Sequence, residues 1–321
     1  MTRARRRGYP DPIARLGDTD LDVHRLCLGG NVFGWTLDEE RSFAVLDAYA
    51  AAGGNFIDTA DTYGRRGDGA GSSERTIGRW IAARGNRDRL VIATKVGMSP
   101  ELPGLSAATI QAAADASIER LGIDTIDLYY AHSDDAETPL EETLGAFQRL
   151  IDEGKVRHVA ASNYSAERLQ LALSLGECDG LARYVALQPH YNLLERDYER
   201  EQAPVCEQEG LACIPYFGLA RGFLSGKYRR GGAEIDSPRA AGVRESYFNE
   251  RAWSVLEALE QVAAAHQTAL AAVALAWLGA QPTVLAPIAS ASTPEQLREL
   301  LAAGELELSP QELARLSAAG A

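Results

Sequence analysis

The sequence predicts an α/β protein, a (β/α)8 barrel that forms one domain with active-site loops at its C-terminal face. Short apolar runs alternate with amphipathic segments along the whole chain, and we count eight such runs. This alternation is typical of parallel βαβ units, and eight units suggest closure into a barrel. An open doubly wound sheet is the alternative. It lacks its usual nucleotide mark here, because no GxGxxG joins a strand to a helix.

Each expected element follows from its local pattern. The apolar, strand-like runs are Arg25–Leu28, Asn55–Ile57, Leu90–Thr94, Ile126–Ala131, Val156–Ala161, Tyr184–Leu187, Leu211–Ile214 and Thr283–Ala286. Helix-like stretches lie near 39–52, 73–84, 106–121, 139–153, 165–174, 197–209 and 249–280, and two more close the chain at 294–303 and 310–319. The polar, glycine-rich stretch 229–246 predicts an active-site loop.

The ends of the chain and its length set the domain boundaries. A length of 321 residues suits a single barrel, which we place at 13–321. The basic start has no apolar stretch behind it, so residues 1–12 are expected to be a flexible tail and not a signal peptide. No apolar run approaches the roughly 18 residues that a membrane span needs.

Composition excludes several classes of partner. The net charge of −13 argues against nucleic acids and anionic membranes. The four cysteines are scattered without CxxC spacing, which indicates a reducing, cytoplasmic compartment. The five histidines show no metal-ligand spacing, so no metal is expected.

Six successive expected strands each lead into a polar or hydrogen-bonding side chain. In a barrel these carboxyl ends share one face, where active sites are built. Alone, each residue has a bland interpretation, such as a turn cap for Asp58, a solvated loop lysine for Lys95 or a satisfied buried histidine for His132. An acid and a base on adjacent strand ends can pair, however, which favours a site. The residues are Asp58, Lys95, His132, Ser162 with Asn163, Gln188 and Tyr216.

Tyr63 adds a proton donor to this set. A tyrosine titrates near ~10, too weakly acidic to protonate an alkoxide quickly at neutral pH. A neighbouring ammonium such as Lys95 favours the phenolate and lowers that pKa. With His132 donating to the substrate oxygen, the set fits carbonyl reduction. A glycosidase that uses Asp58 and Asp61 is an alternative, but it gives Lys95 and Tyr63 no role.

Six motifs occur in order along the chain: Asn55-Phe-Ile-Asp-Thr-Ala-Asp-Thr-Tyr-Gly64, Ala93-Thr-Lys-Val-Gly97, Ile126-Asp-Leu-Tyr-Tyr-Ala-His132, Gly154-Lys-Val-Arg157, Ala161-Ser-Asn163 and Leu219-Ala-Arg-Gly-Phe-Leu-Ser-Gly-Lys-Tyr228. Together they resemble the aldo-keto reductases. The resemblance runs from about Ile13 to Leu316 and is closest to the bacterial and potassium-channel β-subunit-like branch.

The resemblance implies a catalytic tetrad of Asp58, Tyr63, Lys95 and His132 and a hydride from NADP(H), with NAD(H) as an alternative. It implies a small carbonyl substrate near Phe33, Trp35, Tyr63 and His132, and leaves the oligomeric state open. Ser162, Asn163 and Gln188 would hold the carboxamide, Tyr216 would stack on the nicotinamide, and Arg239 would face the 2′-phosphate. The other implied cofactor residues are Gly30, Asn31, Asp58, Phe217, Gly218, Leu219, Ala220, Arg221, Lys227, Ser290, Ser292, Gln296 and Glu299.

Three departures from the family pattern bear on the cofactor. Phe217 stands where serine is usual, Leu300 replaces an asparagine near the adenine, and 290–293 has no lysine or arginine. An NADP(H)-binding regulatory subunit with little turnover is the alternative function. That group tends to replace the residue at His132, whereas all four tetrad residues are present here.

Overall fold

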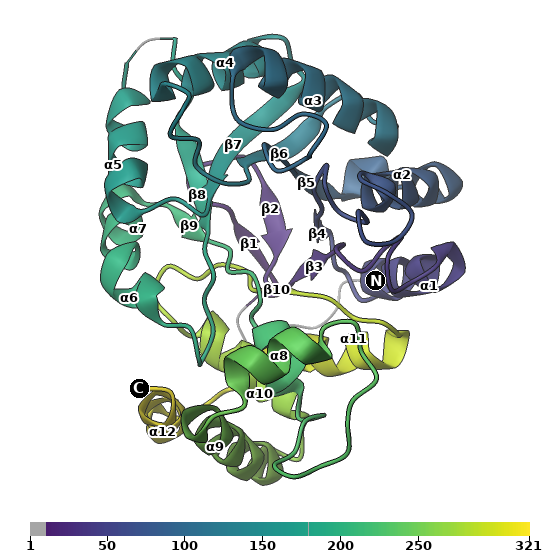
Figure 1. The fold of residues 1–321 in the computed structure, drawn as a ribbon, viewed down its shortest axis with the longest axis vertical. Coiled ribbons are helices and arrows are strands. Elements are labelled where there is room, and N and C mark those ends of the chain that lie inside the picture. Colours follow the sequence, from purple (N-terminus) through teal and green to yellow (C-terminus); the bar gives the residue numbers. More distant parts are fainter. Residues whose placement is uncertain (1–10, 179) are drawn as a thin grey trace.

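The structure is a computed structural model, described here for residues 11–178 and 180–321 (Figure 1). Eight parallel strands form the main sheet in the order β10-β3-β4-β5-β6-β7-β8-β9. The strands are β3 (Cys27–Gly29), β4 (Phe56–Asp58), β5 (Val91–Val96), β6 (Ile126–Ala131), β7 (Val156–Ser162), β8 (Tyr184–Gln188), β9 (Ala212–Cys213) and β10 (Ile288–Ala289).

The sheet closes on itself. Cys213 in β9 donates its N–H to Thr283 O and accepts from Leu285 N, both at 2.9 Å, so β9 contacts the segment that leads into β10. β10 in turn pairs with β3, in the register Ile288 with Cys27. The predicted (β/α)8 barrel is therefore confirmed, and an open doubly wound sheet is excluded.

The eighth strand does not lie where the sequence predicted it, at 283–286. Thr283 has a left-handed φ of 66°, and Val284 forms only an isolated bridge with Cys213. The regular strand begins after Pro287, whose carbonyl accepts from Cys27 N at 3.0 Å. The apolar sequence after Thr283 predicts burial of this segment as far as residue 289. It does not predict which of these residues form the hydrogen bonds between β10 and β3.

Helices cover the outside of the barrel between successive strands (Figure 1). They match most predicted helices within a residue or two: α1 (Glu39–Ala51), α2 (Ser72–Arg84), α3 (Ala107–Leu121), α4 (Leu140–Asp152), α5 (Ala166–Leu175), α11 (Pro294–Leu301) and α12 (Pro310–Ala319). No single helix in the described ranges is long and apolar enough to cross a membrane, although α9 (Glu250–His266) and α10 (Leu270–Gly279) together pass that test as a bent pair.

Three predictions about helices were wrong in detail. The helix predicted at 197–209 is two helices, α6 (Asp197–Glu201) and α7 (Ala203–Glu209), and Pro204 lies in the first turn of α7. The stretch 249–280 divides at Gln267, whose φ of 52° ends α9 (Glu250–His266) before α10 (Leu270–Gly279). The predicted loop at 229–246 contains most of α8 (Ala240–Tyr247).

An antiparallel hairpin that the sequence did not predict closes the amino-terminal end of the barrel. β1 (Ile13–Arg15) pairs with β2 (Asp22–His24), and the hairpin lies behind the barrel strands in Figure 1. Leu16, Leu21 and Val23 are fully or almost fully buried in one cluster with the inward-facing side chains of the barrel. The hairpin therefore forms the floor of the barrel interior.

The predicted tail at 1–12 lies mostly outside the described residues. Its last two residues are bonded, because Arg25 donates its N–H to Pro12 O at 2.8 Å and its Nε to Asp11 O at 3.0 Å. The extent of the tail therefore stays a prediction.

The hairpin floor generates a stability prediction. Leu21→Ala should destabilise the fold by about 2–5 kcal/mol, because it leaves a cavity against rigid strands. Leu171, which is 47% exposed, offers a matched control, and Leu171→Ala should change stability by no more than about 0.5 kcal/mol. Urea unfolding of both variants measures the difference. Equal effects would show that the hairpin does not contribute to the core.

Candidate active site

A cavity of about 530 Å³ opens at the carboxyl ends of the barrel strands. Most of the side chains that the sequence predicted for a site lie in its wall. These are Asn31, Asp58, Tyr63, His132, Ser162, Asn163, Gln188, Tyr216, Phe217, Gly218, Leu219, Arg221, Arg239 and Ser290. The arrangement follows from the fold, because parallel strands deliver the residues at their carboxyl ends to one face.

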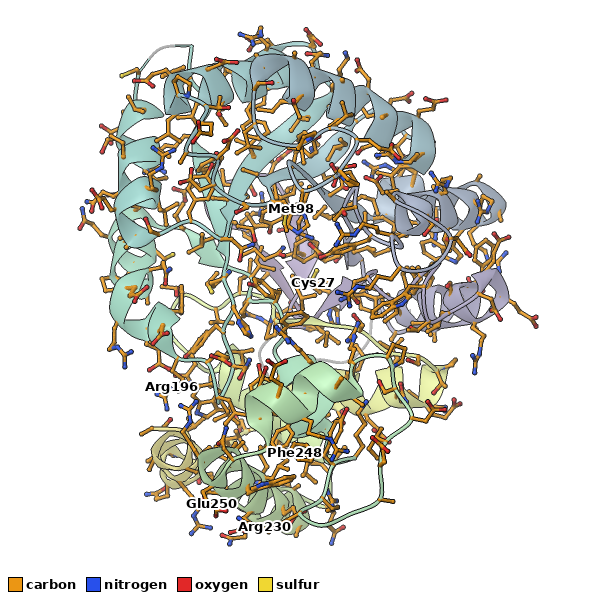
Figure 2. All side chains as sticks on the ribbon, in the orientation of Figure 1. Cys27, Met98, Arg196, Arg230, Phe248 and Glu250 are labelled. Carbon is orange, nitrogen blue, oxygen red and sulfur yellow. The ribbon has the colours of Figure 1, made fainter. Side chains whose placement is uncertain are left out.

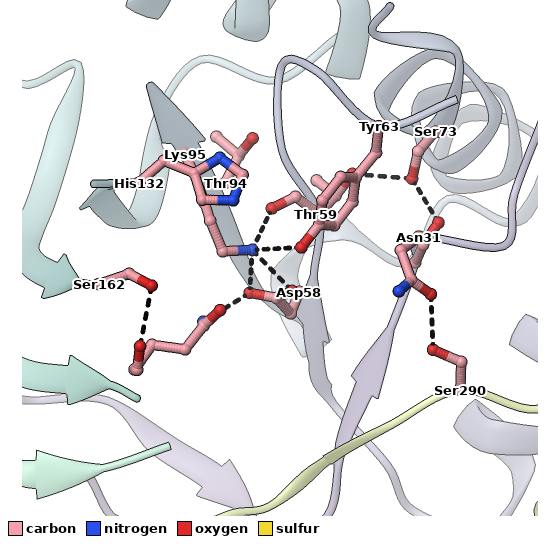
Figure 3. A network of polar contacts seen from close by, with 12 residues as sticks. Asn31, Asp58, Thr59, Tyr63, Ser73, Thr94, Lys95, His132, Ser162 and Ser290 are labelled. Atoms are coloured by element: carbon pink, nitrogen blue, oxygen red, sulfur yellow. Dashed lines mark hydrogen bonds and ion pairs between the residues drawn. The ribbon is translucent and has the colours of Figure 1, made fainter. Parts of the chain in front are cut away.

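Lys95 lies at the centre of the polar network drawn in Figure 3. Its side chain is fully buried, and Nζ donates to both carboxylate oxygens of Asp58 at 2.7 Å and to Thr59 O at 2.8 Å. Burial alone would lower the pKa of Lys95, but the charge and hydrogen bonds of Asp58 together with Tyr63 outweigh it, and the pKa is raised. The lysine therefore stays an ammonium inside the barrel.

Tyr63 lies above this ammonium, in the turn that follows β4. Lys95 Nζ is 3.2 Å from the hydroxyl of Tyr63 and 4.7 Å from the centre of its ring. Burial raises the pKa of Tyr63, and Lys95 opposes that rise without cancelling it. The expectation of a net lowered pKa was wrong for this state of the protein: the ammonium acts in the expected direction, but desolvation of the phenolate is the larger effect.

His132 faces Tyr63 from the end of β6. The two rings meet edge to face, with centroids 5.9 Å apart. Burial, and secondarily the Lys95 charge, lower the pKa of His132 well below its ordinary value. At neutral pH the ring is therefore neutral, and it can donate a hydrogen bond without supplying a formal charge.

The residues expected around a carboxamide hold one another in place. Gln188 donates its side-chain amide to Asp58 Oδ1 at 2.9 Å, and its backbone carbonyl accepts from Ser162 Oγ at 2.8 Å. Asn163 donates to His132 O, and its own Oδ1 accepts from the Tyr216 hydroxyl, both at 2.8 Å. The stacking surface of Tyr216 is thus linked through Asn163 to the His132 backbone.

The turn after β9 stores backbone strain at the edge of the cavity. Phe217, Ala220 and Arg221 all have left-handed φ values, between 48° and 57°, and Gly222 follows at 97°. Residues other than glycine rarely adopt this backbone conformation, and such strain is often found at ligand sites. A left-handed residue after a right-handed one, as Ala220 follows Leu219, is also the backbone pattern of anion-binding nests.

Cations without carboxylate partners gather beside this turn. Arg221, Lys227 and Arg239 form no ion pair in the described part of the chain, and Arg221 Nε is buried without a hydrogen-bond partner. Arg239 is anchored instead by Asn31, whose Oδ1 accepts from its NH2 group at 3.3 Å and from Ser290 Oγ at 2.9 Å. Its guanidinium lies 5.3 Å from the centre of the Trp35 ring.

Some predicted site residues lie outside the cavity wall. Phe33 is fully buried in the layer between sheet and helices, so its assignment to the substrate pocket was wrong. Trp35 is next to the cavity, beside Arg239, and not in its wall. Gly30 donates its N–H to Asp58 O, Ala220 is buried, and Lys227 is set back from the wall. Ser292, Gln296 and Glu299 are exposed on or just before α11, and Leu300 is buried in the core.

Met98 is the main wall residue that the sequence analysis missed. It is 49% exposed, a large value for an apolar side chain, and Figure 2 labels it near the centre of the barrel. It follows the same strand as Lys95, so its position after β5 was the available signal. The other missed wall residues are Gly29, Ser133, Gly222, Ile288 and Ala289. No group of metal ligands lies within 11–178 or 180–321.

Comparison with known proteins agrees with this site. A family model described as "Aldo/keto reductase family" matches residues 25–321. "Uncharacterized oxidoreductase YrpG" of Bacillus subtilis (strain 168) is 35% identical over 94% of this chain and 94% of its own length. "Norsolorinic acid reductase stcV" of Emericella nidulans is 34% identical over 91% of the chain and 77% of its own length.

A further relative names a cofactor. "Aldo-keto reductase yakc [NADP(+)]" of Schizosaccharomyces pombe is 32% identical over 93% of this chain and 88% of its own length. The narrower branch suggested by the sequence motifs stays a prediction. The family match covers the barrel and every tetrad position, and the chain belongs to the aldo/keto reductase family of NAD(P)H-dependent oxidoreductases.

Proposed function

We propose that this protein is an NADP(H)-dependent carbonyl reductase in which Tyr63 is the general acid. The observation that carries the proposal is the contact of the Tyr63 hydroxyl with the buried Lys95 ammonium, 3.2 Å away, at the base of an open cavity. An ammonium held by Asp58 compensates the negative charge that forms on Tyr63 when the proton leaves.

The geometry supports a division of labour among the four residues. A carbonyl oxygen between Tyr63 and His132 would accept a hydrogen bond from the neutral imidazole and a proton from the phenol. Asp58 keeps Lys95 charged and fixes its position by accepting at both oxygens. A bound nicotinamide supplies the hydride. The remaining residues orient the two reactants and keep water from the reacting carbon.

The chain fits a dinucleotide on structural grounds. The strained turn at 217–222 suits a pyrophosphate, because Arg221 brings a positive charge to it and Arg221 Nε has no hydrogen-bond partner among the described residues. The amides of Asn163 and Gln188 suit a carboxamide. At Gly29 an added Cβ would lie 2.7 Å from Ser290 Oγ, so glycine is needed there for Ser290 to pack against the end of β3.

Recognition of the 2′-phosphate is proposed for Arg239, with Lys227 behind it. Arg239 shares the Asn31 amide with Ser290, which begins the segment expected to hold the adenosine. The rest of that segment, 291–293, offers only hydroxyls and an alanine, so the preference for NADP(H) over NAD(H) should be real but modest. The NADP(+) in the name of the fission yeast relative agrees with this order of preference.

The substrate we propose is a small carbonyl compound with an apolar or aromatic face. Met98 lines the cavity together with Tyr63 and His132, and an exposed thioether adapts to varied apolar shapes. Relatives are named as reductases of norsolorinic acid and as an aryl-alcohol dehydrogenase.

A cytoplasmic location remains an expectation from the cysteine pattern.

Two competing functions are less well supported. A binding subunit with little turnover would not need the complete tetrad, in which Asp58, Tyr63 and His132 surround Lys95. A glycosidase would need Asp61 as a second carboxylate in the cavity, yet Asp61 is buried and does not line it.

Removing the proposed acid should separate chemistry from binding. Tyr63→Phe should slow the chemical step by about 10²–10⁴-fold and change the Kd of NADPH by less than about twofold, because only the proton donor is lost. Tyr164→Phe, which removes a phenol bonded to Tyr184 outside this cavity, is the matched control. Single-turnover absorbance of NADPH with an aryl aldehyde measures the step. A variant with normal turnover would refute Tyr63 as the acid.

Cofactor choice should depend on Arg239. Arg239→Ala should weaken NADPH binding by roughly ten- to a hundredfold and leave NADH nearly unchanged, as expected for a lost charge-assisted contact to phosphate. Arg66→Ala is the control, because Arg66 lies 5.9 Å from the same Trp35 ring but does not line the cavity. Fluorescence titration of both cofactors decides the matter, and equal losses for NADPH and NADH would contradict phosphate recognition by Arg239.

A further inference from the structure

Asp61 is a buried acid that the proposed mechanism does not use. It lies between Asp58 and Tyr63 in the turn after β4, and only 4% of its surface is exposed. Among the described residues, no side chain donates a hydrogen bond to either carboxylate oxygen, although the Thr62 backbone favours the ionised form. Burial nevertheless disfavours the carboxylate, since these contacts only partly replace the water it has lost.

The charged side chains around Asp61 only partly compensate its burial. Glu74 of α2 is fully buried and already satisfied, because Thr94 Oγ1 donates to one oxygen at 2.5 Å and Arg120 Nε to the other at 2.6 Å. The charges that act on Asp61 are Glu74, which opposes ionisation, and Arg120 and Lys95, which favour it. Tyr129 of β6, whose hydroxyl is also buried and unpartnered, completes the set.

Asp61 is joined to the catalytic residues through the backbone. Its N–H donates to Lys95 O at 3.2 Å, and Tyr63 N donates to Ala60 O at 3.1 Å, so the turn rests on the end of β5. Lys95 points into the barrel while its neighbour Thr94 points outward to Glu74, as alternate residues of a strand must. Asp61 thus connects the outward cluster with the turn that carries Tyr63.

We propose that Asp61 is a positioning residue for Tyr63: as a neutral carboxyl it lets the turn rest on β5, and as a carboxylate it displaces the turn and slows the reaction. The proposal rests on the reductase function proposed above. Burial, with the nearby charge of Glu74, raises the pKa of Asp61 from 3.8 to about 7, so the change falls near neutral pH. The Asp61 carboxylate would be repelled by Glu74 and would have few hydrogen-bond donors. Both effects would favour movement of the turn toward water, which would separate Tyr63 from Lys95.

The pH dependence of the chemical step tests this inference. Single-turnover NADPH oxidation with a carbonyl substrate should fall about tenfold from pH 6 to pH 8 in the unaltered protein, as the neutral form of a group with a pKa of about 7 declines. Asp61→Asn, which stays neutral, should abolish most of that fall. Asp68→Asn removes an exposed aspartate from the same loop and should leave the profile unchanged.

A second measurement needs no catalysis. Because the folded-state pKa of Asp61 lies above its unfolded value of 3.8, its contribution to stability is fully present below about pH 4 and is lost as the pH rises to about 7. The Tm of Asp61→Asn minus that of the unaltered protein should therefore grow from pH 5 to pH 8, by at least about 3 °C. Asp68→Asn should show no such trend.

The two measurements separate the inference from the function it rests on. A Tm difference that does not change with pH would overturn the ionisation of Asp61. A changing Tm difference with identical pH–rate profiles in both proteins would overturn its positioning role and leave the reductase intact. If no carbonyl compound is reduced at any pH while the Tm difference changes as expected, the reductase proposal fails, and the positioning role fails with it.

Discussion

The buried ion pair of Lys95 and Asp58 is the interaction on which the rest of the site depends. An ammonium with no exposed surface would be unstable alone, and here it is held by two carboxylate oxygens and the Thr59 carbonyl. The same carboxylate accepts from Gln188, so the pair also positions a residue from the far side of the barrel. The barrel and its hairpin floor keep water from this pair, which makes its charges effective at the Tyr63 hydroxyl.

Much of this site could be predicted because it depends on position along the chain. Residues directly after apolar runs reach the carboxyl face whatever the details of packing. Asp58, His132 and Gln188 in the cavity wall follow that rule, as does Lys95 beneath Tyr63. Phe33 does not follow the prediction because it lies in the loop after β3. A side chain in this loop can point either into the layer between sheet and helices, as Phe33 does, or into the cavity. Sequence pattern alone does not decide between these two directions.

Other features depend on contacts between distant segments. The hairpin of β1 and β2 was missed because its strands are three residues each, and only burial against the barrel reveals them as a floor. The ladder of β10 starts later than the apolar run because it must meet Cys27 of β3. The direction of the Tyr63 pKa shift could not be predicted from the sequence either. It depends on whether desolvation or the charge of Lys95 has the larger effect.

The central claim is that the Lys95 ammonium makes Tyr63 easier to ionise than its burial alone would allow. The most direct measurement is the pKa of Tyr63 itself, from the ¹³C resonance of the Tyr ring carbon that bears the hydroxyl, assigned with Tyr63→Phe. In Lys95→Met that pKa should rise above the value in the unaltered protein, because the charge that opposes desolvation is gone. An unchanged or lower pKa in Lys95→Met would contradict the account.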